Sequence, residues 1–280
     1  GVSTWRAMTR RRRDTGCHAP VAAPMRVLRA VRVAAHFASG IATQRFVFPR
    51  ADAARRRDLT RAWCRRLPEL MHVEARVHGE FDASGGNVMI VANHVSWLDI
   101  FVLNAQHPAR FVAKSELAAW PLLGRLIRGS GTLFIERARR RDTHRVNGAA
   151  VEALRAGDAV AVFPEGTTTD GSTVLRFHGS LLQPIVDAEG RVLPVAIRYH
   201  DGNGTPSLAP EYAGDTSFAA SFWRVCGVRS LAVDLIASPA MPAAARHRRD
   251  LARGAEEAIR TALARRGAAT EPGTPGDRGA

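Results

Sequence analysis

A histidine and an aspartate lie five residues apart in "VANHVSWLDI", which runs from Val91 to Ile100. An aspartate that accepts a hydrogen bond from one imidazole nitrogen fixes the tautomer and raises the basicity of the other nitrogen. His94 and Asp99 are therefore candidates for a general base and its orienting partner. The alternative is structural: Ser96 or Asp99 caps a helix, and His94 is a solvated turn residue.

The elements around this pair favour the chemical interpretation. "NVMIVAN" is the kind of apolar run that forms a strand buried on both faces, and "SWLDIFVLNAQ" is typical of a following helix. His94 then lies in the turn at the carboxyl end of the strand, where open α/β sheets place their ligands. Asp99, in the first turn of the helix, can reach back to the imidazole.

Three later segments also carry polar or special residues on predicted strands or at their ends. "GTLFIERARRRD" puts Arg137 directly after a buried strand. "FPEGTTTDG" puts Glu165, Gly166 and Thr167 at the end of another. "VLPVAIRY" is an apolar strand that contains Pro194.

In this order, the four segments resemble the motif blocks of the glycerolipid acyltransferases, the 1-acyl-sn-glycerol-3-phosphate (lysophosphatidic acid) acyltransferase family. That family carries N-H-x-x-x-x-D, then G-x-x-F-x-x-R, then a block of the F-P-E-G-T-R-S type, then an apolar block with a proline. The matching residues are Asn93, His94 and Asp99, then Gly131, Phe134 and Arg137, then Phe163–Thr167, and finally Val192–Ile197. Each block alone is unspecific, but four in sequence are hard to obtain by chance.

The resemblance implies an enzyme that moves an acyl chain from acyl-CoA or acyl carrier protein to the hydroxyl of 1-acyl-sn-glycerol-3-phosphate, giving phosphatidic acid. An alcohol is a poor nucleophile, so a base must take its proton during attack. His94 is the expected base and Asp99 its partner. No nucleophilic serine is needed, and the chain has no G-x-S-x-G. The thioester is a co-substrate, and no cofactor or metal ion is expected.

The other blocks imply substrate contacts. Arg137 is expected to hold the acceptor's phosphate through a two-pronged ionic hydrogen bond, with Gly131 and Phe134 in the same substrate-binding block. Backbone N–H groups around Gly166 and Thr167 are expected to stabilise the oxyanion that forms on the thioester oxygen.

Three residues have open alternatives or a supporting role. Glu165 either braces the site, binds an acceptor hydroxyl or pairs with Arg137, and Arg137 has the alternative of being a solvated arginine in "ERARRRD". Asn93 and Pro194 are expected to be structural.

One departure from the family pattern concerns the acceptor. Where arginine usually follows E-G-T, this chain has Thr168, and His178 stands where a lysine is common. Fewer cations favour an acceptor with a smaller or absent phosphate. The alternative acceptor is lyso-ornithine lipid, a phosphorus-free aminolipid that members of this superfamily acylate, although Arg176 lies near and can substitute for the missing arginine.

The formal net charge of +14 indicates an anionic partner: nucleic acid, a phospholipid surface or a phosphorylated substrate. Lys114 is the only lysine, and an arginine-rich codon composition explains this as well as function does. A nucleic-acid binder leaves the four blocks unexplained and lacks an aromatic RNA-binding signature, so nucleic acid is not an expected partner. A non-catalytic membrane-binding protein and a thioester hydrolase remain as alternatives.

The three cysteines, Cys17, Cys64 and Cys226, are far apart and form no metal-binding cluster. Free thiols in a reducing compartment are therefore expected. The arginine-rich start is not followed by an apolar core of sufficient length for a signal peptide.

The pattern of elements predicts an α/β fold, with a mostly parallel central sheet flanked by helices. Two amphipathic helices, about 25–47 and 51–70, precede it and are separated at Pro49. A later helix is expected to start on Asp142 as its cap and to stop at Gly157, and the last helix is expected over about 245–266.

The expected organisation has four parts. Residues 1–23 form a disordered basic segment, 24–71 a membrane-associating helix pair, 72–266 the acyltransferase domain and 267–280 a disordered tail.

The run 27–48 is the best candidate for membrane contact. Arg29, Arg32 and His36 interrupt it, so its apolar stretch falls short of the roughly 18 residues that a span requires. It suits an interfacial helix with arginines toward phosphates and Val, Leu and Phe toward the acyl region; the alternative is packing on its own domain. The enzyme is expected on the cytoplasmic face of a bacterial inner membrane, as a peripheral or monotopic protein that meets a membrane lipid acceptor at the bilayer surface.

Overall fold

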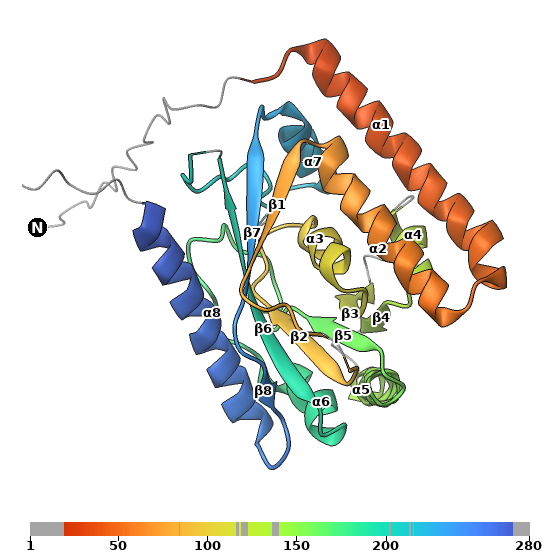
Figure 1. Cartoon of the computed structure of the whole chain (residues 1–280), viewed down its shortest axis with the longest axis vertical. Helices are drawn as coiled ribbons and strands as arrows, with labels where there is room; N and C mark the ends of the chain where they lie inside the picture. The colour runs from red at the N-terminus through yellow and green to blue at the C-terminus, as the bar shows by residue number, and fades with distance from the viewer. Residues whose placement is uncertain are drawn as a thin grey trace, which may run out of the picture.

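The computed structural model describes residues 20–83, 85–115, 118, 123–135, 140–201, 203–212, 214 and 216–270. A twisted sheet forms the middle layer, and helices cover both of its faces (Figure 1). The expected α/β architecture is therefore confirmed.

The described sheet runs in the order β1-β7-β6-β2-β5-β3-β4, with β8 paired to β6. Every neighbouring pair is parallel except β6 with β7 and β6 with β8, so the sheet is mostly parallel, as expected. The strands predicted at the four motif segments are present as β2, β4, β5 and β6. The strands are β1 (Val73–His78), β2 (Val88–Ala92), β3 (Ala109–Lys114), β4 (Leu133–Ile135), β5 (Ala159–Val162), β6 (Arg191–His200), β7 (Leu231–Ala237) and β8 (Met241–Pro242).

Helices on the two faces enclose two apolar clusters. The α-helices are α1 (Ala23–Ala42), α2 (Ala53–Leu70), α3 (Asp99–Gln106), α4 (Leu123–Gly129), α5 (Arg140–Arg155), α6 (Gln183–Asp187), α7 (Phe218–Gly227) and α8 (Arg248–Thr270). Helices α1, α2, α3, α4 and α7 contribute to one cluster, and α5, α6 and α8 to the other (Figure 1).

Strand β2 shows why its sequence is apolar throughout. Val88, Ile90 and Ala92 belong to the first cluster, whereas Met89 and Val91 belong to the second. Successive side chains of a strand point to opposite faces, so a strand covered on both sides needs an apolar residue at every position.

The N-terminal helix pair is present, and α1 is docked on the body of the protein. Arg29 is buried and donates hydrogen bonds to the carbonyl oxygens of Cys226 and Val228, at the end of α7. The expectation that the arginines of this helix face lipid phosphates is therefore wrong for Arg29, because the unpaired carbonyls of a helix end bind its guanidinium instead. Val27 and Val31, in contrast, remain exposed.

Several boundaries differ from expectation. Helix α5 begins at Arg140, so Asp142 lies inside it and does not cap it. Helix α8 continues to Thr270, so the expected tail does not begin at residue 267. At the start of the chain α1 already begins at Ala23, and residues 1–19, with Cys17, lie outside the described residues.

A single π-helical turn, Thr43–Val47, and a 3-10 turn, Phe48–Arg50, join α1 to α2, so the expected break at Pro49 is confirmed. None of the described helices combines the length and the apolar character needed to cross a bilayer.

Candidate active site

The segment that carries His94 leaves β2 at its carboxyl end and is fixed there by Asn93. The Asn93 side chain donates through Nδ2 to the Ile197 carbonyl oxygen at 3.0 Å, and its Oδ1 accepts from the Ile197 N–H at 2.7 Å. The backbone register of β2 with β6 ends at Ala92 and Val195. Asn93 therefore extends the pairing beyond the last strand residue with a side chain, in agreement with its expected structural role.

His94 and Asp99 form the expected pair. The distance between His94 Nδ1 and Asp99 Oδ2 is 2.8 Å, and the same oxygen accepts from the backbone N–H groups of Val95 and Ser96 at 2.8 and 2.9 Å. Of the two alternatives in the sequence, pairing is the observed one: α3 begins without a side-chain capping hydrogen bond, and Asp99 Oδ2 instead holds the turn that precedes the helix. Because a carboxylate only accepts, His94 Nδ1 carries the hydrogen, and in the neutral imidazole Nε2 has the lone pair.

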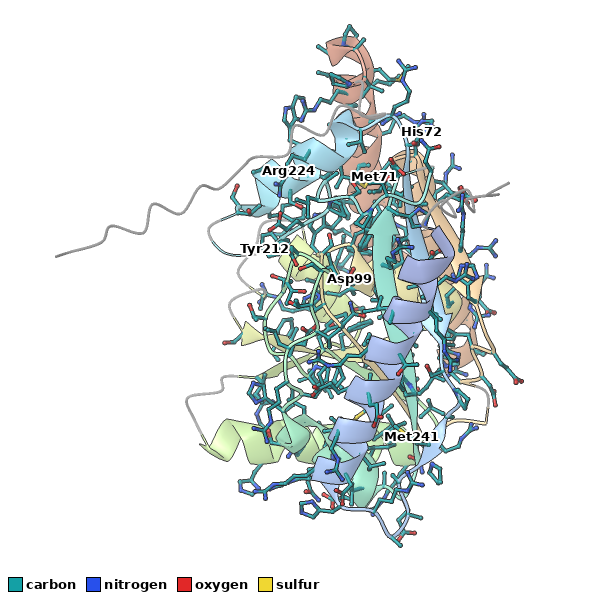
Figure 2. The ribbon with its side chains drawn as sticks, turned by 90° about the vertical axis from the view of Figure 1, so that its left-hand side faces the viewer. Met71, His72, Asp99, Tyr212, Arg224 and Met241 are labelled. Atoms are coloured by element: carbon teal, nitrogen blue, oxygen red, sulfur yellow. The ribbon has the colours of Figure 1, made fainter. Side chains whose placement is uncertain are left out.

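The pair is buried at one end and accessible at the other. Asp99 lies in the interior of the molecule and is fully buried (Figure 2), whereas 20% of the His94 side-chain surface is exposed to solvent. The imidazole stacks on the Phe163 ring, with centroids 3.9 Å apart and planes inclined by 8°. A substrate can therefore reach the imidazole of His94, whereas the Asp99 carboxylate is shielded from solvent.

Glu165 braces the backbone of the histidine. Its Oε1 accepts from the His94 N–H and its Oε2 from the Leu175 N–H, each at 2.7 Å, and the side chain is buried. Burial raises the pKa of this carboxyl above its ordinary value, and the two backbone N–H groups oppose that shift. Of the three roles open in the sequence, this geometry supports bracing.

The turn after Glu165 differs in part from the expected oxyanion site. Gly166 has a φ of 75°, in the region that favours glycine, and its N–H donates to the Phe163 carbonyl oxygen at 3.1 Å. This amide serves the turn itself. Thr167 is exposed, and its N–H is the remaining candidate donor of the expected pair.

Thr168 ties this loop to a neighbouring one. Its Oγ1 donates to the Tyr212 carbonyl oxygen, and the Tyr212 N–H donates to the Val95 carbonyl oxygen at 3.1 Å. The position where the family usually has an arginine is thus used for a neutral contact between two loops that flank His94.

The residues of the second motif block, Gly131 and Phe134, lie in a turn and in a strand respectively. Gly131 has a φ of 77° in the turn between α4 and β4, at the amino end of β4. His94 follows the carboxyl end of a parallel strand of the same sheet, so Gly131 lies at the opposite end of the strands from His94, in a turn that its positive φ permits. Phe134, within β4, packs against the first apolar cluster. Arg137 lies outside the described residues.

Two residues of β6 complete the site. Pro194 lies between the stretches of β6 that pair with β8 and with β7, where the missing N–H of a proline is tolerated. Sequence reasoning missed Tyr199, whose hydroxyl donates to Asp99 Oδ1 at 2.7 Å. The available signal was a tyrosine on an otherwise apolar strand, in a chain with only two tyrosines.

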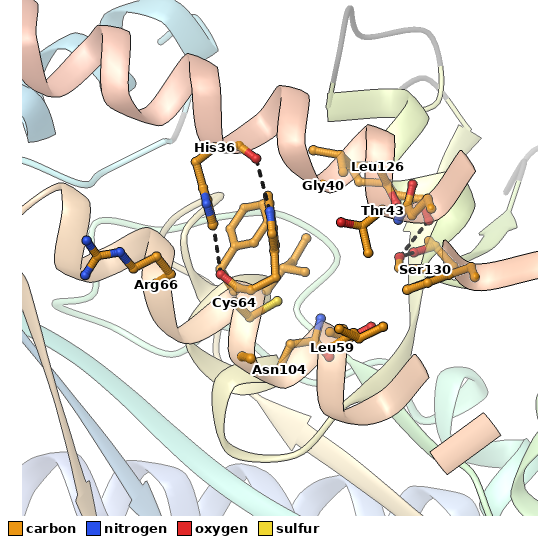
Figure 3. A pocket seen from close by; sticks show the side chains of 18 residues that line it. His36, Gly40, Thr43, Leu59, Cys64, Arg66, Asn104, Leu126 and Ser130 are labelled. Carbon is orange, nitrogen blue, oxygen red and sulfur yellow. Dashed lines mark hydrogen bonds between the residues drawn. The ribbon is translucent and has the colours of Figure 1, made fainter. Parts of the chain in front are cut away.

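A mainly apolar cavity of about 290 Å³ lies between α1, α2, α3 and α4 (Figure 3). Its wall includes Ile100 and Phe101, which follow Asp99 directly, and Gly40 of α1. His36 and Trp63 stack on each other in its wall, with ring centroids 4.4 Å apart, and each ring donates or accepts a hydrogen bond at the other residue's carbonyl oxygen, which joins α1 to α2. The cavity therefore lies against α3, the helix that begins at Asp99, and the N-terminal helices supply the opposite part of its wall.

Comparisons with known proteins find acyltransferase relatives of this chain. The sequence model of a family described as Acyltransferase matches residues 74–198. The chain is 42% identical to a 1-acyl-sn-glycerol-3-phosphate acyltransferase of Neisseria gonorrhoeae over 52% of this chain and 57% of that protein. It is 37% identical to a lyso-ornithine lipid O-acyltransferase of Pseudomonas aeruginosa over 85% of this chain and 93% of that protein.

The fold also has a counterpart among solved structures. The crystal structure of the 1-acyl-sn-glycerophosphate acyltransferase of Thermotoga maritima matches with a TM-score of 0.62 at 23% identity, over 86% of this chain and 97% of that one.

Proposed function

The chain belongs to the glycerolipid acyltransferase family, and from that membership we propose that it transfers a fatty acyl group from a thioester to the free hydroxyl of a lysolipid. The observation that carries the proposal is the His94–Asp99 pair, in which a buried carboxylate binds Nδ1 of an imidazole that is partly exposed. The thioester is acyl-CoA or acyl-acyl carrier protein, and no other cofactor takes part.

The proposed reaction uses His94 Nε2 as general base. It removes the proton of the lysolipid hydroxyl while the oxygen attacks the thioester carbonyl, and the carbonyl oxygen becomes an oxyanion. Asp99 holds the Nδ1–H and stabilises the imidazolium. When the intermediate collapses, the C–S bond breaks and the thiolate leaves with the proton from His94. The products are the acylated lipid and the free thiol of the carrier.

The oxyanion needs a fixed donor, and the proposed one is the backbone N–H of Thr167, which is an exposed residue. The proposed place for the donor's acyl chain is the cavity beside α3, because its wall is mainly apolar and includes Ile100 and Phe101 of the helix that begins at Asp99.

The acceptor is a membrane lipid, so the enzyme has to work at a bilayer. The exposed apolar residues of α1 and of the turn after it support an interfacial position: Met25, Val27, Leu28, Val31, Phe46 and Val47. We place the protein on the cytoplasmic face of a bacterial inner membrane, where the thioester donor is supplied.

Two acceptors are candidates. The first is 1-acyl-sn-glycerol-3-phosphate, with Arg137 binding its phosphate and phosphatidic acid as product. The second is lyso-ornithine lipid. It is favoured by Thr168, a neutral residue bonded to the Tyr212 carbonyl where a cation is usual, and by similarity over nearly the whole length of the Pseudomonas aeruginosa protein.

The test offers both acceptors side by side to the full-length protein, with a radiolabelled acyl donor. We expect transfer by the wild type and none by His94→Ala. Arg137→Ala should raise the acceptor KM for the phosphate-bearing acceptor. No transfer to either acceptor, or equal transfer by His94→Ala, would overturn the proposed function.

A pair of variants at Thr168 separates the acceptors. Thr168→Val removes only the hydroxyl, and Thr168→Arg adds the missing cation. If charge at this position selects the acceptor, Thr168→Arg should shift preference toward the phosphate-bearing lysolipid, whereas Thr168→Val should leave the preference as in the wild type.

A further inference from the structure

Strand β6 is hydrogen-bonded to both ends of the segment that carries His94, the segment from Asn93 to Asp99. Ile197 binds the Asn93 side chain through its backbone N–H and C=O groups, and Tyr199 binds Asp99 through its hydroxyl. Ile197 and Tyr199 belong to the same apolar cluster, on one face of a strand at the centre of the sheet. His94 lies between the two anchored residues, Asn93 and Asp99.

The two oxygens of Asp99 have separate partners. Oδ2 accepts from His94 Nδ1 and from the N–H groups of Val95 and Ser96, whereas Oδ1 accepts from Tyr199 at 2.7 Å. Rotation of a carboxylate about its last torsion is soft. A donor on Oδ1 therefore acts together with the two backbone N–H groups on Oδ2 to fix the plane of the carboxylate, and with it the direction in which His94 is held.

We propose that Tyr199 is a positioning residue of the acyl transfer reaction: its hydrogen bond to Asp99 Oδ1 sets the orientation of the His94–Asp99 pair and the strength with which His94 holds a proton. This inference rests on the proposed function. It assigns no substrate contact to Tyr199, which is buried.

The surroundings make the Tyr199 hydroxyl a permanent donor. Burial, followed by the charge of Asp99 and the hydrogen bond to it, raises the pKa of Tyr199 well above its ordinary value, so the phenol stays protonated wherever the enzyme works. A hydrogen bond with the Ser96 side chain opposes this rise in the pKa of Tyr199 without cancelling it. Glu165 also interacts electrostatically with His94 and Asp99, and every variant below leaves it in place.

The direction of the effect follows from the charge on Asp99. A donor on Oδ1 stabilises the carboxylate and weakens its pull on the proton of His94. Without that donor, His94 holds a proton more tightly, and the neutral base becomes available only at higher pH. The acid limb of the kcat/KM profile should then move to higher pH, and the looser orientation should lower kcat.

The experiment compares Tyr199→Phe with the wild type and His94→Ala, all as full-length protein with the same acyl donor and lysolipid. A hydrogen bond to a charged group corresponds to about 10-fold to 100-fold in rate, so we expect kcat to fall at least about tenfold. Both KM values should stay near those of the wild type, and the acid limb should move to higher pH.

A second variant tests the opposite direction and keeps the ring. Site-specific replacement of Tyr199 by a fluorinated tyrosine gives a more acidic and therefore stronger donor, which should move the acid limb to lower pH. This variant decides the question if Tyr199→Phe does not fold. Ser221→Ala is the matched control, because Ser221 is a buried hydroxyl that accepts from Trp97 Nε1 and donates to the Pro210 carbonyl without contacting Asp99.

The outcomes are distinguishable. Opposite displacements of the acid limb by the phenylalanine and fluorotyrosine variants, with none in Ser221→Ala, support the proposal. An active wild type and inactive His94→Ala, with an unmoved acid limb in the folded Tyr199 variants, would overturn it and leave the proposed function standing. An inactive wild type would overturn both.

Discussion

Glu165→Gln tests whether this buried carboxylate supports His94 or binds the acceptor. The two carboxylate oxygens accept the N–H groups of His94 and Leu175 at 2.7 Å each. A glutamine offers one acceptor oxygen and one donor NH₂, so one buried N–H must face another donor. A buried donor without a partner costs about 1–3 kcal/mol, and we expect a loss of about 2 kcal/mol in the free energy of unfolding.

The same substitution should reduce kcat, because the backbone of His94 loses one of its supports. The acceptor KM should stay unchanged, since Glu165 is buried and both of its oxygens are occupied by the chain itself. Urea unfolding and steady-state kinetics on the same preparations measure the two effects. Glu152→Gln, at an exposed position of α5, is the matched control and should change neither.

The pH dependence of the free energy of unfolding gives an independent check on the burial of the Glu165 carboxyl. Burial raises the folded-state pKa of Glu165 above its ordinary value of 4.5, so the folded protein binds this proton more tightly than the unfolded chain. The resulting stabilisation is present below pH 4.5 and is lost as the pH rises through the raised pKa. The difference in the free energy of unfolding between the wild type and Glu165→Gln should therefore become smaller as the pH rises through that window. A raised acceptor KM together with unchanged stability would refute the bracing role.

Four further outcomes follow from the described contacts. Asn93→Ala leaves the buried N–H and C=O groups of Ile197 without partners and should lower the free energy of unfolding by about 2–6 kcal/mol in urea titrations; a smaller loss would mean that water replaces both bonds. Cys64 and Cys226 are buried, with the pKa of Cys226 raised to about 11, so neither thiol should react with iodoacetamide at neutral pH before unfolding, as read by peptide mass spectrometry. Gly40→Leu places a side chain where even a Cβ lies 2.8 Å from Trp63 and Leu126, so transfer of long acyl chains should fall more than transfer of short ones. Val31→Glu, at 59% exposure, should weaken binding to anionic vesicles in flotation assays without lowering stability, and unchanged flotation would count against α1 as the bilayer contact.

The sequence by itself determined the layered fold and the position of the catalytic pair. An apolar run such as "VMIVA" can only be buried on both faces, so it required a sheet with helices on each side. His94 comes two residues after this run, and Asp99 is the first residue of the following helix. The two residues are only five positions apart, so the local backbone geometry is enough to bring them together. The family resemblance rests on the same local blocks.

Only the tertiary structure decided which groups hold that pair in place. Tyr199 lies 100 residues beyond Asp99 and reaches it because β6 pairs beside β2, a choice made by the packing of the whole sheet. The docking of Arg29 on the end of α7 and the turn role of Gly131 at the far sheet edge depend in the same way on contacts between distant segments. Periodicity and motif spacing describe neighbours along the chain, whereas hydrogen-bond partners across a sheet are fixed by strand order and register, which burial of all the apolar faces together selects.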